Sequence, residues 1–342
     1  MDTAVNRQYR LKARPEGRIK PGDFELVRSE VPKAGPGEAV ARQLYLSLDP
    51  TNRIWMADVE QYMPPVQLGE VMRGIGLAQV VESKSPRYAV GDLVSGLTGW
   101  QDYVLINAGN ANMLTPVPKG LDVPPQMLLG VLGLTGLTAY FGLLEIGQPK
   151  EGETVVISAA AGATGSVAGQ IAKIKSCRAV GIAGGAEKCR WLVDELGFDA
   201  AIDYRAAGWQ ERLRAACPNG VDINFENVGG EIMDTVMSLM NLHGRVVLCG
   251  LISGYNAGEP MRGRFDLILM KRLRAQGFIV TDFIREFPSA VFQLVQWHLE
   301  GKLKHRDTVI DGLEQAPTAI NMLFDGGNVG KLLIKVADRP LA

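Results

Sequence analysis

The chain has 342 residues, with 36 lysines and arginines against 37 aspartates and glutamates, and its formal net charge is −1. This length is sufficient for about two domains with sizeable cores. Because the charges balance, no global field favours nucleic acid or an acidic membrane surface, and we expect neither as a partner. The four cysteines form no C-x-x-C pair, so we expect a reduced, cytoplasmic setting.

The first 120 residues have the pattern of a compact β-rich domain. Short apolar runs, among them 40–48 and 91–94, are separated by Pro and Gly and predict strands. Near the other end of the chain, a predicted helix at 287–300 precedes a final apolar strand at 331–336. We expect the chain to return there and complete the first domain. The predicted domains are therefore 1–125 together with 305–342, and 126–304.

Residues 127–144 form an uncharged, mostly apolar run of eighteen residues, at the lower limit of a membrane-spanning length. Gly130, Gly133 and Gly136 are spaced by three, which predicts a smooth helical face for close packing. No basic residues flank the run, and a nucleotide-binding pattern follows it directly. We therefore predict a buried helix between the domains rather than a membrane span.

From residue 154 onward, apolar strands alternate with helices. This alternation predicts an α/β fold with a doubly wound parallel sheet, whose ligands bind at the carboxyl ends of the strands. The expected strands are 154–158, 179–183, 200–203, 221–226, 245–249 and 275–280, and the expected helices are about 166–175, 187–196, 208–216, 230–240 and 264–272.

The first of these strands leads into a turn of small residues, Ala159 to Gly165. In this layout the bare N–H groups at a helix N-terminus cradle a pyrophosphate. Gly162 would let the backbone approach the phosphates, and Gly165 would let helix and strand pack closely. Ala160 stands where the first glycine of G-x-G-x-x-G is usual, so the motif is incomplete. The motif still indicates dinucleotide binding because it lies between a predicted strand and a predicted helix.

The end of the second expected strand, 179–183, indicates which dinucleotide binds. The strand ends in Gly184 and Gly185, with no acid to bind a free ribose 2′-hydroxyl, and Lys188 can offer a positive charge to a 2′-phosphate. The nearest acid, Glu187, suits the start of the following helix. This pattern favours NADPH over NADH. The alternative interpretation is that Lys188 is a solvated lysine of the first helical turn.

Six segments spread over nearly the whole chain carry a family resemblance. They are Leu46–Arg53, Gly136–Gly142, Ala159–Lys173, Asn227–Gly230, Cys249–Asn256 and Gly327–Lys331. In them the chain resembles the medium-chain dehydrogenase/reductase superfamily, and most of all its zinc-independent branch of prostaglandin reductases, plant alkenal reductases and bacterial curcumin reductase. The resemblance implies a GroES-like β-rich catalytic domain, a Rossmann NADP-binding domain and a homodimer that pairs through 275–280. The residues alone show only that 275–280 is apolar.

The resemblance also implies positions for the NADPH contacts. It places Thr164 and Gly165 at the pyrophosphate, and Lys188 and Tyr204 at the 2′-phosphate. Gly162 and Ala163 of the same turn are predicted cofactor contacts from the strand–turn–helix pattern. The residues implied along the nicotinamide half are Asn227, Gly250, Tyr255, Phe278, Val280 and Asn328. For Asn328 the residues alone indicate a turn, in Gly-Gly-Asn-Val-Gly.

Zinc catalysis is not expected in this chain. Zinc sites need two or three Cys, His or carboxylate ligands with an open position, and residues 1–125 contain no cysteine and no histidine. Where zinc-dependent relatives have Gly-His-Glu, this chain has Gly69-Glu70-Val71. His243, His298 and His305 are expected on helix or turn surfaces. We therefore predict no bound metal.

A metal-free reductase can still reduce a C=C bond conjugated to a carbonyl. Hydride adds to the β-carbon, and hydrogen-bond donors stabilise the charge that develops on the oxygen. Tyr255 is the predicted proton donor, although it can instead stack on the cofactor without acid chemistry. Thr51, Tyr62 and Tyr103 are predicted pocket residues, with plain packing as the alternative for both tyrosines. Many relatives have an aromatic residue at position 51, and the loop 259–264 is unusually charged. Both positions are expected to border the substrate pocket, so the resemblance predicts the substrate less well than it predicts the cofactor.

The expected activity is NADPH-dependent reduction of enones and enals. Two alternatives remain open at this stage: an NADPH quinone reductase of the same superfamily, and a protein that binds NADPH without turnover.

Overall fold

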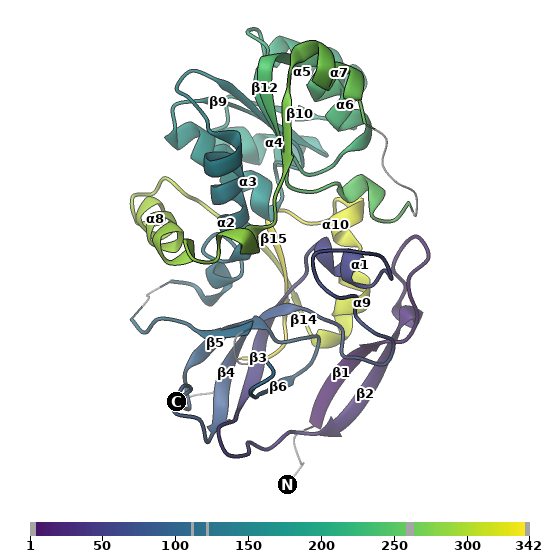
Figure 1. Cartoon of the computed structure of the whole chain (residues 1–342), viewed down its shortest axis with the longest axis vertical. Coiled ribbons are helices and arrows are strands. Elements are labelled where there is room, and N and C mark those ends of the chain that lie inside the picture. Colours follow the sequence, from purple (N-terminus) through teal and green to yellow (C-terminus); the bar gives the residue numbers. More distant parts are fainter. Residues whose placement is uncertain (1–4, 111–112, 121–122, 258–262, 339–342) are drawn as a thin grey trace. The chain divides into compact units, whose positions relative to one another are not determined.

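The computed structural model describes residues 5–110, 113–120, 123–257 and 263–338 (Figure 1). The chain divides into two compact units, Met1–Leu129 with Asp307–Gly327 and Leu332–Ala342, and Gly130–Arg306 with Asn328–Lys331. The domain boundaries expected between residues 125 and 126 and between residues 304 and 305 stay predictions. The short return of Asn328–Lys331 to the second unit was not anticipated from the sequence.

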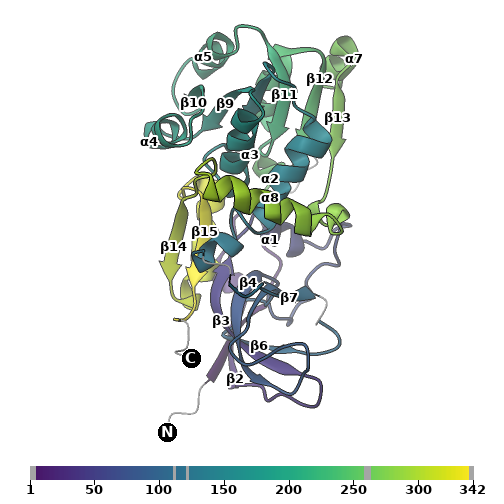
Figure 2. The same ribbon diagram turned by 90° about the vertical axis from the view of Figure 1, so that its left-hand side faces the viewer.

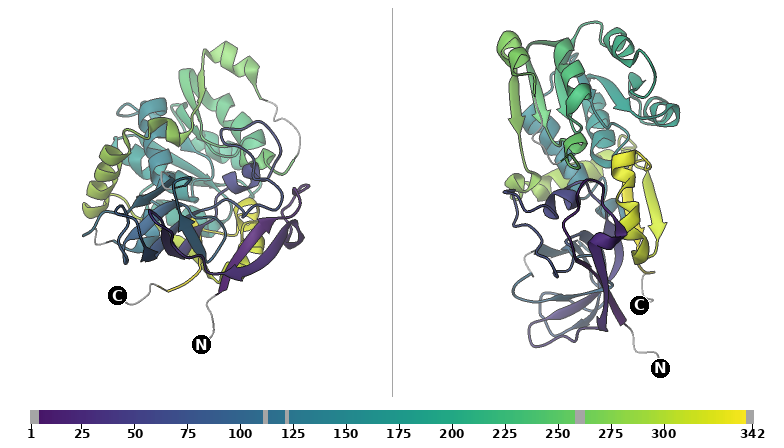
Figure 3. Two further views of the ribbon diagram at one scale, coloured as in Figure 1. Left: turned by 60° about the horizontal axis from the view of Figure 1, so that its bottom comes forward. Right: turned by 90° about the vertical axis from the view of Figure 1, so that its right-hand side faces the viewer.

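The first unit is built almost entirely from antiparallel strands. β1 (Val5–Leu11) and β2 (Phe24–Glu30) form a hairpin pair. A second sheet has the order β14-β15-β3-β4-β5-β7, with β6 paired to β3 outside this order. Figure 3 shows the yellow C-terminal strands beside the purple and blue strands of this unit. The members are β14 (Asp307–Asp311), β15 (Lys331–Lys335), β3 (Ala39–Ser47), β4 (Ile75–Ser83), β5 (Leu93–Leu97), β7 (Leu114–Pro116) and β6 (Tyr103–Ile106).

The strands expected at 40–48 and 91–94 are found as β3 and β5. β5 begins two residues later than expected, because Gly91 has a φ of +90° and forms part of the preceding turn. Buried apolar side chains fill the unit, and the rings of Phe24 and Trp100 stack with centroids 5.2 Å apart. Short helices complete it: α1 (Thr51–Trp55), α9 (Ala316–Ala319) and α10 (Met322–Asp325).

The second unit contains a six-stranded sheet in which every described pairing is parallel. Its order, β10-β9-β8-β11-β12-β13, is that of two βαβαβ halves meeting between β8 and β11. The predicted doubly wound sheet is confirmed. The strands are β8 (Thr154–Ile157), β9 (Arg178–Ala183), β10 (Ala200–Asp203), β11 (Val221–Glu226), β12 (Met240–Leu248) and β13 (Arg274–Gly277).

Helices cover this sheet, and Figure 2 shows α2 and α3 in front of the strands. β8 is buried at every position, which explains its uninterrupted β-branched sequence. The helices are α2 (Leu134–Phe141), α3 (Ala163–Ile174), α4 (Ala186–Arg190), α5 (Trp209–Ala216), α6 (Gly230–Leu239), α7 (Phe265–Lys271) and α8 (Phe287–Leu299), with π-helical continuations of α2 (Gly142–Gly147) and α4 (Trp191–Glu195).

Two predictions about these elements were wrong. The run 127–144 is not one helix, because Gly133 adopts an extended backbone and caps α2, so Gly130 and Gly133 do not lie on a helical face with Gly136. Gly136 is needed for another reason: a Cβ there would overlap the carbonyl oxygen of Val131. The last strand ends at Gly277 rather than 280, and Val280 begins the 3-10 helix η7 (Val280–Phe283). Within the described part of the chain, no helix is both long and apolar enough to reach across a bilayer.

Candidate active site

The turn between β8 and α3 is built for close approach. Ala159 has a φ of +48°, in the left-handed region, and Gly162 caps α3 with extended backbone. A Cβ at Gly165 would lie 2.5 Å from the carbonyl oxygen of Ala159, so glycine is required for helix and strand to pack this closely. The N–H groups of Ala163 and Thr164 belong to the first helical turn, which has no intrahelical acceptors, and such groups bind anions.

The departure from G-x-G-x-x-G at Ala160 is accommodated by the neighbouring strand. Ala160 is fully buried, and its N–H donates to the carbonyl oxygen of Ile182 at 3.0 Å. A Cβ added to Gly181 of β9 would lie 2.9 Å from the Ala160 methyl group. The alanine at 160 therefore fits because the chain has a glycine at 181.

Two cationic side chains meet beyond the ends of β9 and β10. Burial lowers the pKa of Lys188 in α4, and the nearby positive charge of Arg205 lowers it further. The guanidinium carbon of Arg205 lies 5.8 Å from the centre of the Tyr204 ring. Sequence reasoning identified Lys188 and Tyr204 but missed Arg205, although it directly follows Tyr204.

Asp203, the last residue of β10, fixes the backbone around these cations. Its Oδ1 accepts the N–H groups of Gly185 at 2.9 Å and of Arg205 at 3.0 Å, and these bonds hold the pKa of Asp203 below its ordinary value. A Cβ at Gly184 would lie 2.9 Å from Nε of Arg205, so the glycine leaves room for the arginine. The end of β9 thus presents cations and glycines, which fits a phosphorylated ribose.

A network of hydrogen bonds joins the ends of β8, β11 and β12. Asn227 donates from Nδ2 to the carbonyl oxygen of Ser158 and from its backbone N–H to Ser158 Oγ, both at 2.7 Å. Its own carbonyl oxygen accepts the N–H of Ile252 at 3.1 Å. The carbonyl oxygen of Glu226 accepts the N–H of Gly250 at 3.0 Å. The residues expected along the nicotinamide half are therefore fixed to the turn expected at the pyrophosphate.

Three of the predicted cofactor residues line one hollow of about 430 Å³ at the carboxyl end of β12 and β13: Gly250, Tyr255 and Phe278. Cys249 and Asp282 also line it. Val280 is not among its lining residues, because the strand ends early. The hydroxyl oxygen of Tyr255 accepts the N–H of Leu251 at 3.1 Å, which fixes the phenol in the lining of the hollow.

Aromatic packing holds the other side of this hollow. A Cβ at Gly142 would lie 2.6 Å from Cζ of Phe278, so the glycine makes room for the ring. Phe278 lies edge-on to Phe283, which stacks on Phe141 with centroids 4.6 Å apart. Cys249 contributes no nucleophile here, because burial raises the pKa of its thiol to about 12.

Asn328 belongs to the short return into the second unit. It is buried, and its Nδ2 donates to the carbonyl oxygen of Gly330 at 2.9 Å. The N–H of Gly330 in turn donates to the carbonyl oxygen of Ala161 at 2.8 Å. The structure therefore places Asn328 beside the β8–α3 turn.

The predicted pocket residues of the first unit are brought together only in part. The hydroxyl groups of Thr51 and Tyr62 are hydrogen bonded, and Nε1 of Trp55 donates to the same Tyr62 oxygen at 3.0 Å. Burial raises the pKa of Tyr62. Tyr103 begins β6 opposite Arg42 of β3, and its place in a pocket stays a prediction. Most of the charged loop 259–264 lies outside the described residues.

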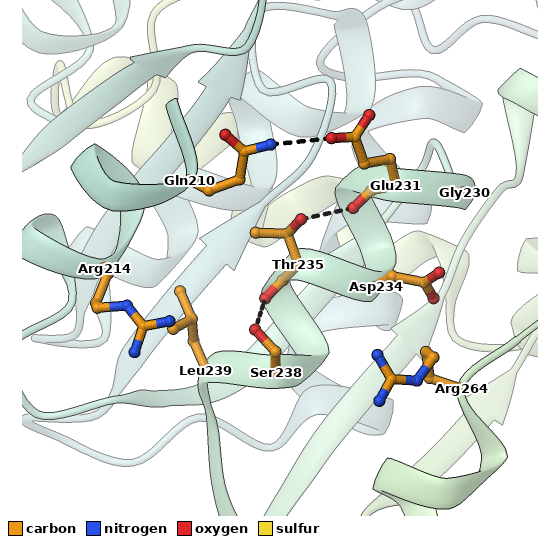
Figure 4. Close-up of a pocket in the computed structure, with 9 residues that line it drawn as sticks. All are labelled: Gln210, Arg214, Gly230, Glu231, Asp234, Thr235, Ser238, Leu239 and Arg264. Carbon is orange, nitrogen blue, oxygen red and sulfur yellow. Dashed lines mark hydrogen bonds between the residues drawn. The ribbon is translucent and has the colours of Figure 1, made fainter. Parts of the chain in front are cut away.

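A second hollow, of about 580 Å³, lies on the surface of α5 and α6 (Figure 4). Its lining is charged and includes Arg214, Glu231, Asp234 and Arg264. Gln210 donates to Glu231 across it at 2.9 Å. It contains none of the predicted site residues. Within the described residues, no group of three or more His, Cys, Asp or Glu is placed to hold a metal ion.

A doubly wound parallel sheet, an anion-binding turn, two cations beside glycines at the ends of β9 and β10, and a hollow that contains a tyrosine at the carboxyl edge define a dinucleotide-dependent oxidoreductase. Comparison with known protein families supports this class of enzyme. Residues 7–114 match the model described as the N-terminal domain of oxidoreductase, and residues 163–297 match the model described as zinc-binding dehydrogenase.

Relatives that match over nearly their whole length show which oxidoreductases the chain is similar to. The chain is 45% identical to the NADPH-dependent curcumin reductase of Escherichia coli K12, over 97% of both chains. It is 39% identical to the NADP-dependent 2-alkenal reductase of Nicotiana tabacum, over 97% of this chain and 98% of the relative. The crystal structure of CurA from Vibrio vulnificus in complex with NADPH superposes with a TM-score of 0.92 at 43% identity, covering 97% of this chain and 99% of that one.

The chain belongs to the medium-chain dehydrogenase/reductase superfamily, in the branch of curcumin, alkenal and prostaglandin reductases. The resemblance found in the sequence is confirmed, as is the fold it implied, a GroES-like β-rich domain with a Rossmann domain.

Proposed function

We propose that the chain reduces the C=C bond of α,β-unsaturated ketones and aldehydes with NADPH. The observation that carries the proposal is the hollow at the carboxyl edge of the Rossmann sheet, where the N–H of Leu251 holds the phenol of Tyr255 beside Gly250. The curcumin and alkenal reductases named above act on conjugated C=C bonds, and their similarity extends over nearly the whole chain.

When bound, NADPH supplies the hydride. The hydride forms a new C–H bond at the β-carbon, and the electron pair of the C=C bond moves toward the carbonyl oxygen. Hydrogen-bond donors at that oxygen would stabilise the enolate, and the O–H of Tyr255 would supply the proton that the α-carbon gains. Tyr255 is the proposed donor, and Gly162–Gly165, Asn227, Phe278 and Asn328 hold the cofactor. In the first unit, Thr51 and Tyr62 border the substrate.

A substrate panel tests this proposal. Purified protein should oxidise NADPH with a medium-chain 2-alkenal or an aryl enone, and should show little activity with saturated alcohols and NADP+. Oxidation of NADPH with quinones alone would favour the quinone reductase. NADPH binding at micromolar affinity without turnover across the panel would favour a non-catalytic protein.

The Tyr255→Phe variant tests the donor. It should lower kcat with an alkenal by about ten- to a hundredfold, below the full range of general acid catalysis because the ribose 2′-hydroxyl can donate in its place. The KM for NADPH should change little, since the ring remains. Tyr140→Phe in α2 is the matched control, because it removes a phenol oxygen outside the hollow. Unchanged turnover in Tyr255→Phe would remove the donor role.

The two cations at the ends of β9 and β10 should select NADPH over NADH. Charge-assisted hydrogen bonds to a phosphate contribute strongly, so Lys188→Ala or Arg205→Ala should each raise the KM for NADPH by roughly ten- to a hundredfold. The KM for NADH should change by less than about threefold, because NADH carries no 2′-phosphate. Lys302→Ala, on the surface beside Glu300, is the charge-matched control. Equal losses for both cofactors would contradict the assignment.

We also propose a homodimer that pairs through β13. This strand is the edge of the sheet, all four of its residues are exposed, and α7 beside it exposes Phe265, Leu269 and Met270. An exposed strand edge with apolar flanks is a template for pairing. Sedimentation should give twice the chain mass of 37.0 kDa. Ala275→Lys should shift the protein to the monomer, because a lysine on the edge blocks pairing; a wild-type monomer would contradict the proposal.

A further inference from the structure

The carboxylate of Glu226 is a buried anion at the end of β11. Its side chain has no solvent exposure, and every hydrogen bond described for it comes from an uncharged donor. Oε1 accepts Ser158 Oγ at 2.7 Å and the N–H groups of Val228 at 2.7 Å and Gly229 at 2.9 Å. Oε2 accepts Nδ2 of Asn224 at 3.0 Å. All four partners donate, so they match the ionised carboxylate.

This anion is built into the start of a helix. Gly229 is the N-cap of α6 and Val228 precedes it, so the carboxylate lies at the N-terminal end of the helix, where the helix dipole favours negative charge. The chain therefore supplies its own carboxylate to the β11–α6 turn, whereas the β8–α3 turn has no such residue and leaves its amides to the pyrophosphate.

The anion lies directly behind the hollow that contains Tyr255. The carbonyl oxygen of Glu226 accepts the N–H groups of Cys249 at 2.9 Å and Gly250 at 3.0 Å, and both residues line the hollow. The charge acts across this distance: after burial, the negative charge of Glu226 is the next cause that raises the pKa of the Cys249 thiol.

We infer that Glu226 is an electrostatic positioning residue that favours the oxidised, positively charged nicotinamide over the reduced, neutral one. The inference rests on the proposed NADPH-dependent function and adds a residue to it. An anion that stabilises the charged ring makes hydride donation more favourable. A buried anion that only ties the β11–α6 turn in place would affect both cofactor forms equally.

The ratio of two affinities separates these roles. Glu226→Gln should raise the ratio Kd(NADP+)/Kd(NADPH) by about tenfold, because a unit charge about 10 Å from another in a medium of effective dielectric constant 20 changes a binding constant by about that factor. Both constants are measured by titration of the purified full chain without substrate. Glu226→Asp retains the charge, so its ratio should remain within about twofold of the wild type even if both affinities fall.

Two further variants make the test decisive. Ser158→Ala removes a donor but no charge, so it should weaken both cofactor forms by the same factor. Glu226→Gln places an amide N–H against the Asn224 amide, and if this prevents folding, the pair Glu226→Gln with Asn224→Asp restores the hydrogen bond and moves the charge two residues back along β11. That pair should still raise the ratio, by about threefold.

The outcomes are distinct. A ratio that stays constant in Glu226→Gln or in the double variant overturns the inference, as does an equal shift in Glu226→Asp. A wild-type protein that binds neither NADPH nor NADP+ overturns the proposed function instead.

Discussion

The contact between α3 and β8 is the constraint on which the site depends. Gly165 approaches the Ala159 carbonyl so closely that any Cβ would lie 2.5 Å from it, and Ala159 itself adopts a left-handed φ to make the turn. A non-glycine residue in that region is strained by about 1 kcal/mol or more, and such strain persists where the surroundings over-determine it. Here the strain places bare helix amides at the carboxyl edge of a parallel sheet, where ligands of this fold bind.

The rest of the edge is fixed to this turn by hydrogen bonds rather than by packing alone. Ser158 joins β8 to Asn227, Asn227 joins to Ile252, and Gly330 joins the return segment to Ala161. Loops that carry function are usually mobile, but these share buried donors and acceptors whose separation would leave polar groups unpaired. The geometry of the turns proposed to bind the nicotinamide is therefore set by the same atoms that fix the turn proposed to bind the pyrophosphate.

The amino-acid sequence was sufficient to predict secondary structure where its apolar pattern indicates which residues are buried. The central strands of the second unit, such as β8, were predicted because a parallel strand covered on both faces must be apolar throughout. The run 127–144 misled for the same reason: its composition reports burial, but the extended backbone of Gly133 breaks it before α2. Val280 was misplaced because apolar character continues past the last strand pairing, at Gly277.

The site residues that sequence reasoning missed act through partners far away in the chain. The role of Arg205 becomes clear once Lys188 is known to lie near it, and that of Glu226 once Ser158, 68 residues earlier, is seen to donate to it. A local signal did exist for Glu226, an acid at the end of a buried apolar strand, because a charge in that position needs several donors.

Charge is divided along the cofactor site in a way that separates affinity from reactivity. A phosphate group is bound by cations, and Lys188 and Arg205 are the proposed cations at the adenosine end. Cations at the other end would oppose a ring that becomes positive when it gives up hydride. The hollow at the proposed nicotinamide end instead has no lysine or arginine among the described residues that line it. The phenol of Tyr255 and the carboxylate of Asp282 line it, and the buried carboxylate of Glu226 lies behind it. A substrate oxygen that gains negative charge only in the transition state is served by a neutral donor such as this phenol, because it stabilises charge as it forms without competing for the phosphates.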